Sequence, residues 1–92
     1  MVENANWLDV NVFVVGISGV LEKIGVVAST SEAAFEISLL GGSLVRLLVD
    51  PIGSDEQFMT EEIMVSKGQM IVLEVTPKLS YSTWYVVDVE AQ

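Results

Sequence analysis

The chain has 92 residues, with thirteen acidic side chains against four basic ones and a formal charge of −9 at pH 7. This length predicts a single domain, and a hydrophobic content of 51% argues against disorder. Because the sequence has no basic cluster, we expect no nucleic-acid partner, and the negative charge disfavours anionic membranes as well. The absence of cysteine and histidine excludes thiol and histidine catalysis, zinc fingers and disulfide frameworks.

The N-terminal residues 1–7 include the polar Glu3, Asn4 and Asn6 and lack the basic start and apolar core of a signal peptide. The uncharged run from Val12 to Leu21 covers ten residues, whereas a membrane-spanning helix needs about 20. We therefore predict a polar N-terminal arm over residues 1–7 and a folded domain over residues 8–90. The localisation stays open, and a cytoplasmic assembly or a virion is our expectation.

Apolar residues alternate with polar ones along most of the chain, with a period of two. Such alternation is typical of half-buried antiparallel strands. Sixteen valines and six isoleucines favour the same structure, because β-branched side chains fit a pleated surface. The pattern covers six segments, which are residues 8–15, 20–28, 33–39, 45–50, 71–76 and 85–90.

The same period predicts which side chains of each segment face inward. In residues 20–28, the expected inward face holds Ile24, Val26 and Ala28, opposite Lys23. The C-terminal segment is expected to turn its other set inward, so that Trp84 lies on the outward face with Asp88 and Glu90. That inward set consists of Tyr85, Val87 and Val89.

Turn-forming residues separate the segments, and Gly41-Gly42 is the best candidate for a tight hairpin. Residues 54–64 allow two interpretations. Residues 54–57 have the form of a capping box that would begin a helix, whereas Phe58–Met59 and Ile63–Val65 fit an edge strand interrupted by two glutamates. We favour the strand, because a seventh strand completes a sandwich more naturally than an isolated helix does.

The sequence therefore predicts an all-β fold, a single antiparallel β-sandwich of about seven strands. Its expected core includes Phe35, Leu47, Ile71, Leu73 and Val87.

Acidic residues are densest in the loop from Asp50 to Glu62, which also contains Asp55, Glu56 and Glu61. Loop carboxylates can bind calcium, but the spacing here is not that of an EF-hand. We favour a solvated acidic loop and keep a weak cation site as the alternative. No nucleophile elbow, phosphate loop or dinucleotide motif is present, so we expect neither an enzyme nor a cofactor.

Two kinds of residue are candidates for binding a partner. Aromatic side chains are enriched at interfaces, which singles out Trp7, Tyr81 and Trp84. Other apolar residues lie on the side of their strands that faces away from the expected core, where an isolated sandwich should be exposed to water. If they share one sheet, they form an apolar outer surface that marks a partner interface. This set consists of Leu48, Met70 and Val72, together with Leu40, Leu44 and Val86.

Two stretches resemble small β-sandwich modules of the immunoglobulin-like and jelly-roll kinds. Residues 19–28 read Gly-Val-Leu-Glu-Lys-Ile-Gly-Val-Val-Ala, and residues 65–75 place Ser66-Lys67-Gly68-Gln69 before an alternating strand. The second stretch is similar to lead-ins of sandwich modules in phage structural proteins. The cysteines and core tryptophan of antibody domains are missing.

The resemblance implies a non-enzymatic structural or interaction module that works through homo-oligomeric or assembly contacts. A small virion or decoration-type protein is the concrete form of this expectation. The alternative is a carbohydrate- or ligand-binding module that uses Trp84, Tyr81 and Trp7.

Overall fold

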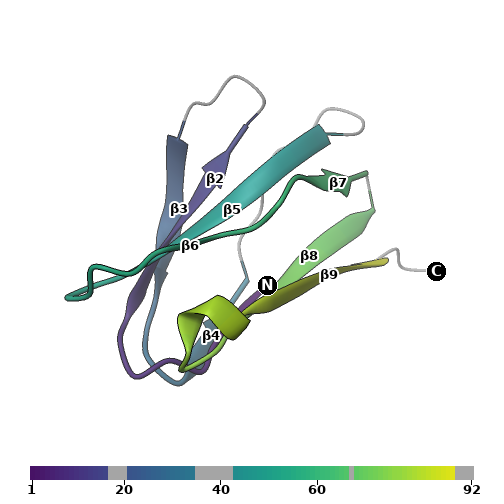
Figure 1. The fold of residues 1–92 in the computed structure, drawn as a ribbon. Coiled ribbons are helices and arrows are strands. Elements are labelled where there is room, and N and C mark those ends of the chain that lie inside the picture. Colours follow the sequence, from purple (N-terminus) through teal and green to yellow (C-terminus); the bar gives the residue numbers. More distant parts are fainter. Residues whose placement is uncertain (17–20, 35–42, 67, 89–92) are drawn as a thin grey trace.

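The computed structural model describes residues 1–16, 21–34, 43–66 and 68–88. These residues form nine β-strands and one short 3-10 helix, as Figure 1 shows. The elements are β1 (Val2–Asn4), β2 (Val10–Val15), β3 (Leu21–Val27), β4 (Ser31–Ala33), β5 (Ser43–Pro51), β6 (Phe58–Met59), β7 (Ile63–Val65), β8 (Gln69–Val75), η1 (Leu79–Tyr81) and β9 (Thr83–Asp88). The expected Gly41-Gly42 hairpin, Phe35 and Val89 lie outside the described residues.

The strands form two sheets that face each other across a common core (Figure 1). The four-stranded sheet has the order β4-β1-β8-β9, and the five-stranded sheet has the order β3-β2-β5-β6 with β7 also paired to β5. This arrangement confirms the predicted all-β sandwich. The pairing is not wholly antiparallel, however, because β1 runs parallel to β8.

The predicted division into an arm over residues 1–7 and a domain over residues 8–90 is wrong for β1. This strand lies between β4 and β8, and Val2 and Asn4 are buried. A three-residue strand is too short to show a period in the sequence, and one of its two inward residues is polar. Trp7, which follows it, is 77% exposed.

The core is supplied mainly by the central strands β2, β5 and β8. The predicted alternation is confirmed there, since every second side chain is buried in each of these strands, although β5 also buries Leu48 and β8 also buries Val72. Removing a Val, Leu or Ile side chain from water contributes about 1.5–3 kcal/mol, so these strands carry most of the hydrophobic stabilisation. Their shared inward set consists of Val10, Val12, Val14, Val45, Leu47, Val49, Ile71, Leu73 and Val75.

The predicted inward face of β3 is wrong for Val26 and Ala28, although Ile24 packs against the core, because the strand contains a β-bulge. Its register with β2 shifts between Val12 and Phe13, which pair with Gly25 and Lys23 and leave Ile24 as the extra residue. The bulge reverses the alternation, so that Val27 is buried while Val26 and Ala28 are exposed.

The predicted orientation of β9 is also wrong. In the register with β8, Trp84 pairs with Leu73 and Val86 pairs with Ile71, so both lie on the core side. Tyr85 consequently faces outward and is 46% exposed. Both faces of this strand are apolar, so its own alternation could not decide which face points inward.

The strand interpretation of residues 54–64 is confirmed, because β6 and β7 pair with successive parts of β5. Thr60 lies between them and is buried. Its backbone N–H donates to the Leu47 carbonyl, and its hydroxyl accepts a hydrogen bond from the Leu47 N–H at 3.0 Å. Ser54 caps no helix but forms a short turn, in which its hydroxyl accepts from the Glu56 N–H.

Candidate functional site

The outward side of the five-stranded sheet is unusually apolar. Three rows of cross-strand neighbours can be followed on it from the register. The central row contains Phe13, Leu48 and Met59, and Leu44 beside Met64 extends the surface at one end. We call this surface the outer apolar face; it consists of Phe13, Val15, Leu21, Val26, Leu44, Leu48, Met59 and Met64.

The exposure of these side chains increases from the centre of the face to its rim. Leu48 is only 8% exposed, although it points away from the core, because Phe13 and Met59 flank it in the same row. Met64 at the rim is 59% exposed and Leu21 is 50% exposed. The outer apolar face therefore has a buried centre and an exposed rim.

Three charged side chains lie among the apolar ones on this side of the sheet. Arg46 and Asp50 stand on β5 on either side of Leu48, and Lys23 lies beside Phe13 on the edge strand β3. These three side chains carry a net charge of +1 on a chain of charge −9. Among the described residues, the structure shows no ion pair to Arg46.

The predicted apolar set does not form one surface. Leu48 belongs to the five-stranded sheet, whereas Met70 and Val72 lie on the outward side of the four-stranded sheet, next to Val87 and Tyr85. Val72 is 5% exposed and Met70 is half-buried. Val86, which was also expected outside, packs against the core. The sequence pattern thus identified outward apolar residues but could not tell which sheet each one joins.

Three glutamates cross the outward side of the four-stranded sheet in one row. Glu3 on β1 is directly opposite Glu32 on β4 and Glu74 on β8. Burial lowers the pKa of the nearby Met1 amino group, and the negative charge of Glu3 opposes that shift. The two outer sides of the sandwich therefore differ in charge as well as in hydrophobicity.

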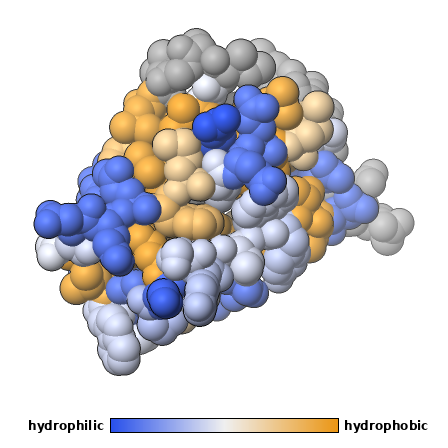
Figure 2. Space-filling view, viewed as in Figure 1, coloured by the Kyte–Doolittle hydropathy of each residue, from blue (hydrophilic) through white to orange (hydrophobic). Residues whose placement is uncertain are grey.

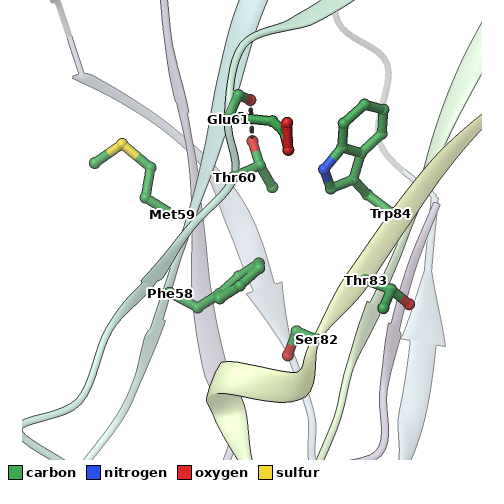
Figure 3. Close-up of a pocket in the computed structure, with 7 residues that line it drawn as sticks. All are labelled: Phe58, Met59, Thr60, Glu61, Ser82, Thr83 and Trp84. Carbon is green, nitrogen blue, oxygen red and sulfur yellow. Dashed lines mark hydrogen bonds between the residues drawn. The ribbon is translucent and has the colours of Figure 1, made fainter.

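A groove opens between β6 and β9, where the edges of the two sheets approach each other. It has a volume of about 490 Å³. Figure 3 shows the Phe58 ring and the Trp84 indole pointing into the gap from opposite strands, while Met59 points away. The remaining lining residues supply oxygen atoms; they are Thr60, Glu61, Ser82 and Thr83.

The three predicted aromatic residues do not converge on this groove. Trp84 lines it, but its indole also packs against the core. Tyr81 is 66% exposed in η1, with the Lys78 ammonium 5.0 Å from its ring centroid. Trp7 is exposed in the loop after β1.

The acidic segment from Asp50 to Glu62 does not gather its carboxylates. No group of three or more ligating side chains is close enough to hold a metal ion in the part of the chain that the structure describes. Within the same residues there is no helix with the length and apolar character needed to cross a membrane.

Several residues of the outer apolar face were not predicted from the sequence, above all Phe13, Leu21, Met59 and Met64. Phe13 and Met64 alternate with buried neighbours and were detectable by period alone. Figure 2 shows that apolar surface also reaches solvent between hydrophilic clusters on the side that carries β6 and β7. No family model matches the chain, and neither the curated proteins nor the solved structures contain one that matches it.

Proposed function

We propose that the protein is a non-enzymatic structural or interaction module that works through assembly contacts made by the outer apolar face. A small virion or decoration-type protein is the concrete form of this proposal. Within the sandwich class, we place the chain among immunoglobulin-like or jelly-roll modules on the strength of the sequence resemblance.

The observation that carries the proposal is the exposure of large apolar side chains on one sheet face. Met59 is 46% exposed beside Leu48, and Leu21 is 50% exposed beside Val15. Side chains that are scattered singly on a surface need no explanation, but a contiguous set around a dry centre at Leu48 does. Contact with another protein surface removes this set from water.

Sedimentation velocity over a range of concentrations tests the proposal. We expect the wild-type chain to sediment above its monomer mass of 10.0 kDa as concentration rises. The double variant Met59→Lys/Met64→Lys should remain a monomer, because it places two ammonium groups in the contact. Tyr85→Lys is the matched control, since Tyr85 is as exposed as Met59 but lies on the other sheet.

Circular dichroism and thermal melting establish that each variant is folded. A wild-type chain that stays at 10.0 kDa at every concentration contradicts the proposal. Dissociation by Tyr85→Lys, with no effect of the double variant, contradicts the choice of face.

The groove supports a second candidate function, the binding of a carbohydrate or similar ligand. An indole beside hydroxyl and carboxylate groups is a combination suited to a sugar, which has apolar C–H faces and polar edges. A glycan array with the wild type, Trp84→Phe and Glu61→Ala tests this alternative. Binding that both variants lose, with unchanged mass, supports it, and an array without binding removes it.

A further inference from the structure

We propose that the occupant of the outer apolar face is a second copy of this chain, packed face to face with β5 antiparallel to the partner's β5. This inference rests on the proposed function and adds the partner and the geometry. The two-fold axis lies in the plane between the two faces. It runs perpendicular to β5 and passes over Leu48.

β5 carries one positive and one negative side chain on this face, and the proposed rotation brings each opposite the other in the partner. Arg46, Leu48 and Asp50 project from the same side of the strand, and the two charged residues lie about 7 Å to either side of Leu48 at about 3.3 Å per residue. Rotation about the proposed axis reverses the strand direction. Arg46 of each copy therefore comes opposite the partner's Asp50, and the dimer contains this pair twice.

The other face-to-face arrangement gives like-charge contacts. If the two β5 strands ran parallel, Arg46 would lie opposite the partner's Arg46 and Asp50 opposite the partner's Asp50. Like charges brought together in an interface oppose association. Stacked sheets cross at about 30°, which displaces the charged groups by only a few ångströms and leaves them within reach of the arginine side chain.

Part of the apolar face matches under the same rotation, whereas Val15 comes opposite the partner's Asn11. The central row of Phe13, Leu48 and Met59 meets its own copy, and so does the exposed Lys23 at the rim of that row, which is the one like-charge contact of this arrangement. The row of Arg46 contains Leu21 at the rim, and the row of Asp50 contains Val26. Leu21 is 50% exposed and Val26 is 46% exposed, and the rotation places each opposite the other in the partner.

Asp50 is the only acidic side chain that the register places on this face, so a contact here adds few of the repulsions expected between identical chains of charge −9. Two of the four basic residues of the chain, Lys23 and Arg46, lie on this face. With strands about 4.8 Å apart, the face measures roughly 20 by 25 Å, enough to bury several hundred Å² from each copy. That area is at the low end for a specific dimer.

A charge-swap series tests the geometry. Arg46→Asp places two aspartates opposite each other, and Asp50→Arg places two arginines opposite each other. We expect each single variant to weaken the dimer at least tenfold, and the double swap Arg46→Asp/Asp50→Arg to return to within about threefold of the wild-type dissociation constant. An equimolar mixture of the two single variants should form heterodimers.

Rescue by the double swap cannot arise within one chain, because positions 46 and 50 are about 13 Å apart along β5. Dissociation constants are measured by sedimentation velocity at low salt and again at 0.5 M NaCl, where we expect the single variants to regain affinity relative to the wild type. A parallel arrangement predicts that all four proteins associate alike.

The two proposals fail in distinguishable ways. A wild-type dimer that Met59→Lys/Met64→Lys dissociates, but whose double swap is as weak as the single variants, overturns the antiparallel geometry and leaves the proposed function standing. A wild-type chain that is monomeric at every concentration overturns both.

Discussion

At the scale of single residues, two buried asparagines hold one end of the sandwich together. The side-chain amide of Asn4 donates to the carbonyls of Leu8, Val27 and Ala28 at 2.9–3.1 Å, and its oxygen accepts from the Asn6 N–H. Asn6 in turn donates to the carbonyls of Thr76 and Pro77. Burial of these side chains costs little free energy because both the amide nitrogen and the amide oxygen of each have hydrogen-bond partners.

Asn4→Asp removes the donor while keeping the shape of the side chain. Three carbonyl oxygens then face a buried carboxylate, so we expect the free energy of unfolding to fall by about 3 kcal/mol or more at pH 7. Urea denaturation measures the change. Gln57→Glu adds the same charge at an exposed position and serves as the control. Equal stability of the two variants would show that the amide of Asn4 is not needed.

Thr30 occupies a backbone conformation that suits few residues. Its φ is 54°, and a β-branched side chain is strained in this left-handed region, whereas asparagine tolerates it. We expect Thr30→Asn to raise the free energy of unfolding by about 0.5–1 kcal/mol and the melting temperature by a few degrees. Calorimetry checks this.

Thr83→Asn is the matched control for Thr30→Asn, because Thr83 lies in the regular strand β9. There the same substitution should lower stability, since asparagine is disfavoured in strands. A loss of stability at both positions would contradict the account of Thr30.

At the scale of elements, β6 and β7 work as one interrupted edge strand with Thr60 at the interruption. The Thr60 hydroxyl takes the place of a strand carbonyl for the Leu47 N–H and donates to the Glu61 carbonyl at 2.9 Å. One side chain therefore completes the hydrogen bonding of β5 where the edge strand leaves it.

Thr60→Val should cost about 1–3 kcal/mol, because it leaves the buried Leu47 N–H without an acceptor at nearly constant volume. Thr60→Ser keeps the hydroxyl and loses one methyl group, which costs about 0.8 kcal/mol. Hydrogen exchange of the Leu47 amide should accelerate in the valine variant and stay slow in the serine variant. Equal exchange rates in both would assign the stability of this edge to packing alone.

Prediction from the sequence succeeded where one face of a strand is apolar and the other polar. The alternation of Val10, Val12 and Val14 with Asn11 fixes the inward face of β2 without further information. It failed in β9, where Trp84 and Tyr85 are both large and the register with β8 decides between them. It failed in β3 because a bulge leaves no signal in composition.

At the scale of the whole molecule, the sandwich has two outer sides of different character. One bears the outer apolar face with Lys23 and Arg46, and the other bears the glutamate row with Val72 and Met70. Period-two patterns indicate that a residue points outward but do not say which sheet its strand joins. The apolar candidates were therefore predictable one by one, and their division between two surfaces was not.

The glutamate row is the place where the high negative charge of the chain works against folding. Glu3 faces a like charge on each side, Glu32 on β4 and Glu74 on β8, and directly opposed like charges destabilise a sheet. Glu3→Gln removes both repulsions, so we expect the free energy of unfolding to rise by about 0.5–1 kcal/mol at low salt.

Salt and a matched neutralisation separate this local effect from the general charge of the chain. The gain from Glu3→Gln should shrink in 0.5 M NaCl, where the Debye length falls to about 4 Å. Glu56→Gln removes the same single negative charge at an exposed loop position and should change the free energy of unfolding by less than half as much as Glu3→Gln does. If the two variants gain equally, the repulsion belongs to the whole molecule, and the alignment of Glu3, Glu32 and Glu74 has no separate cost.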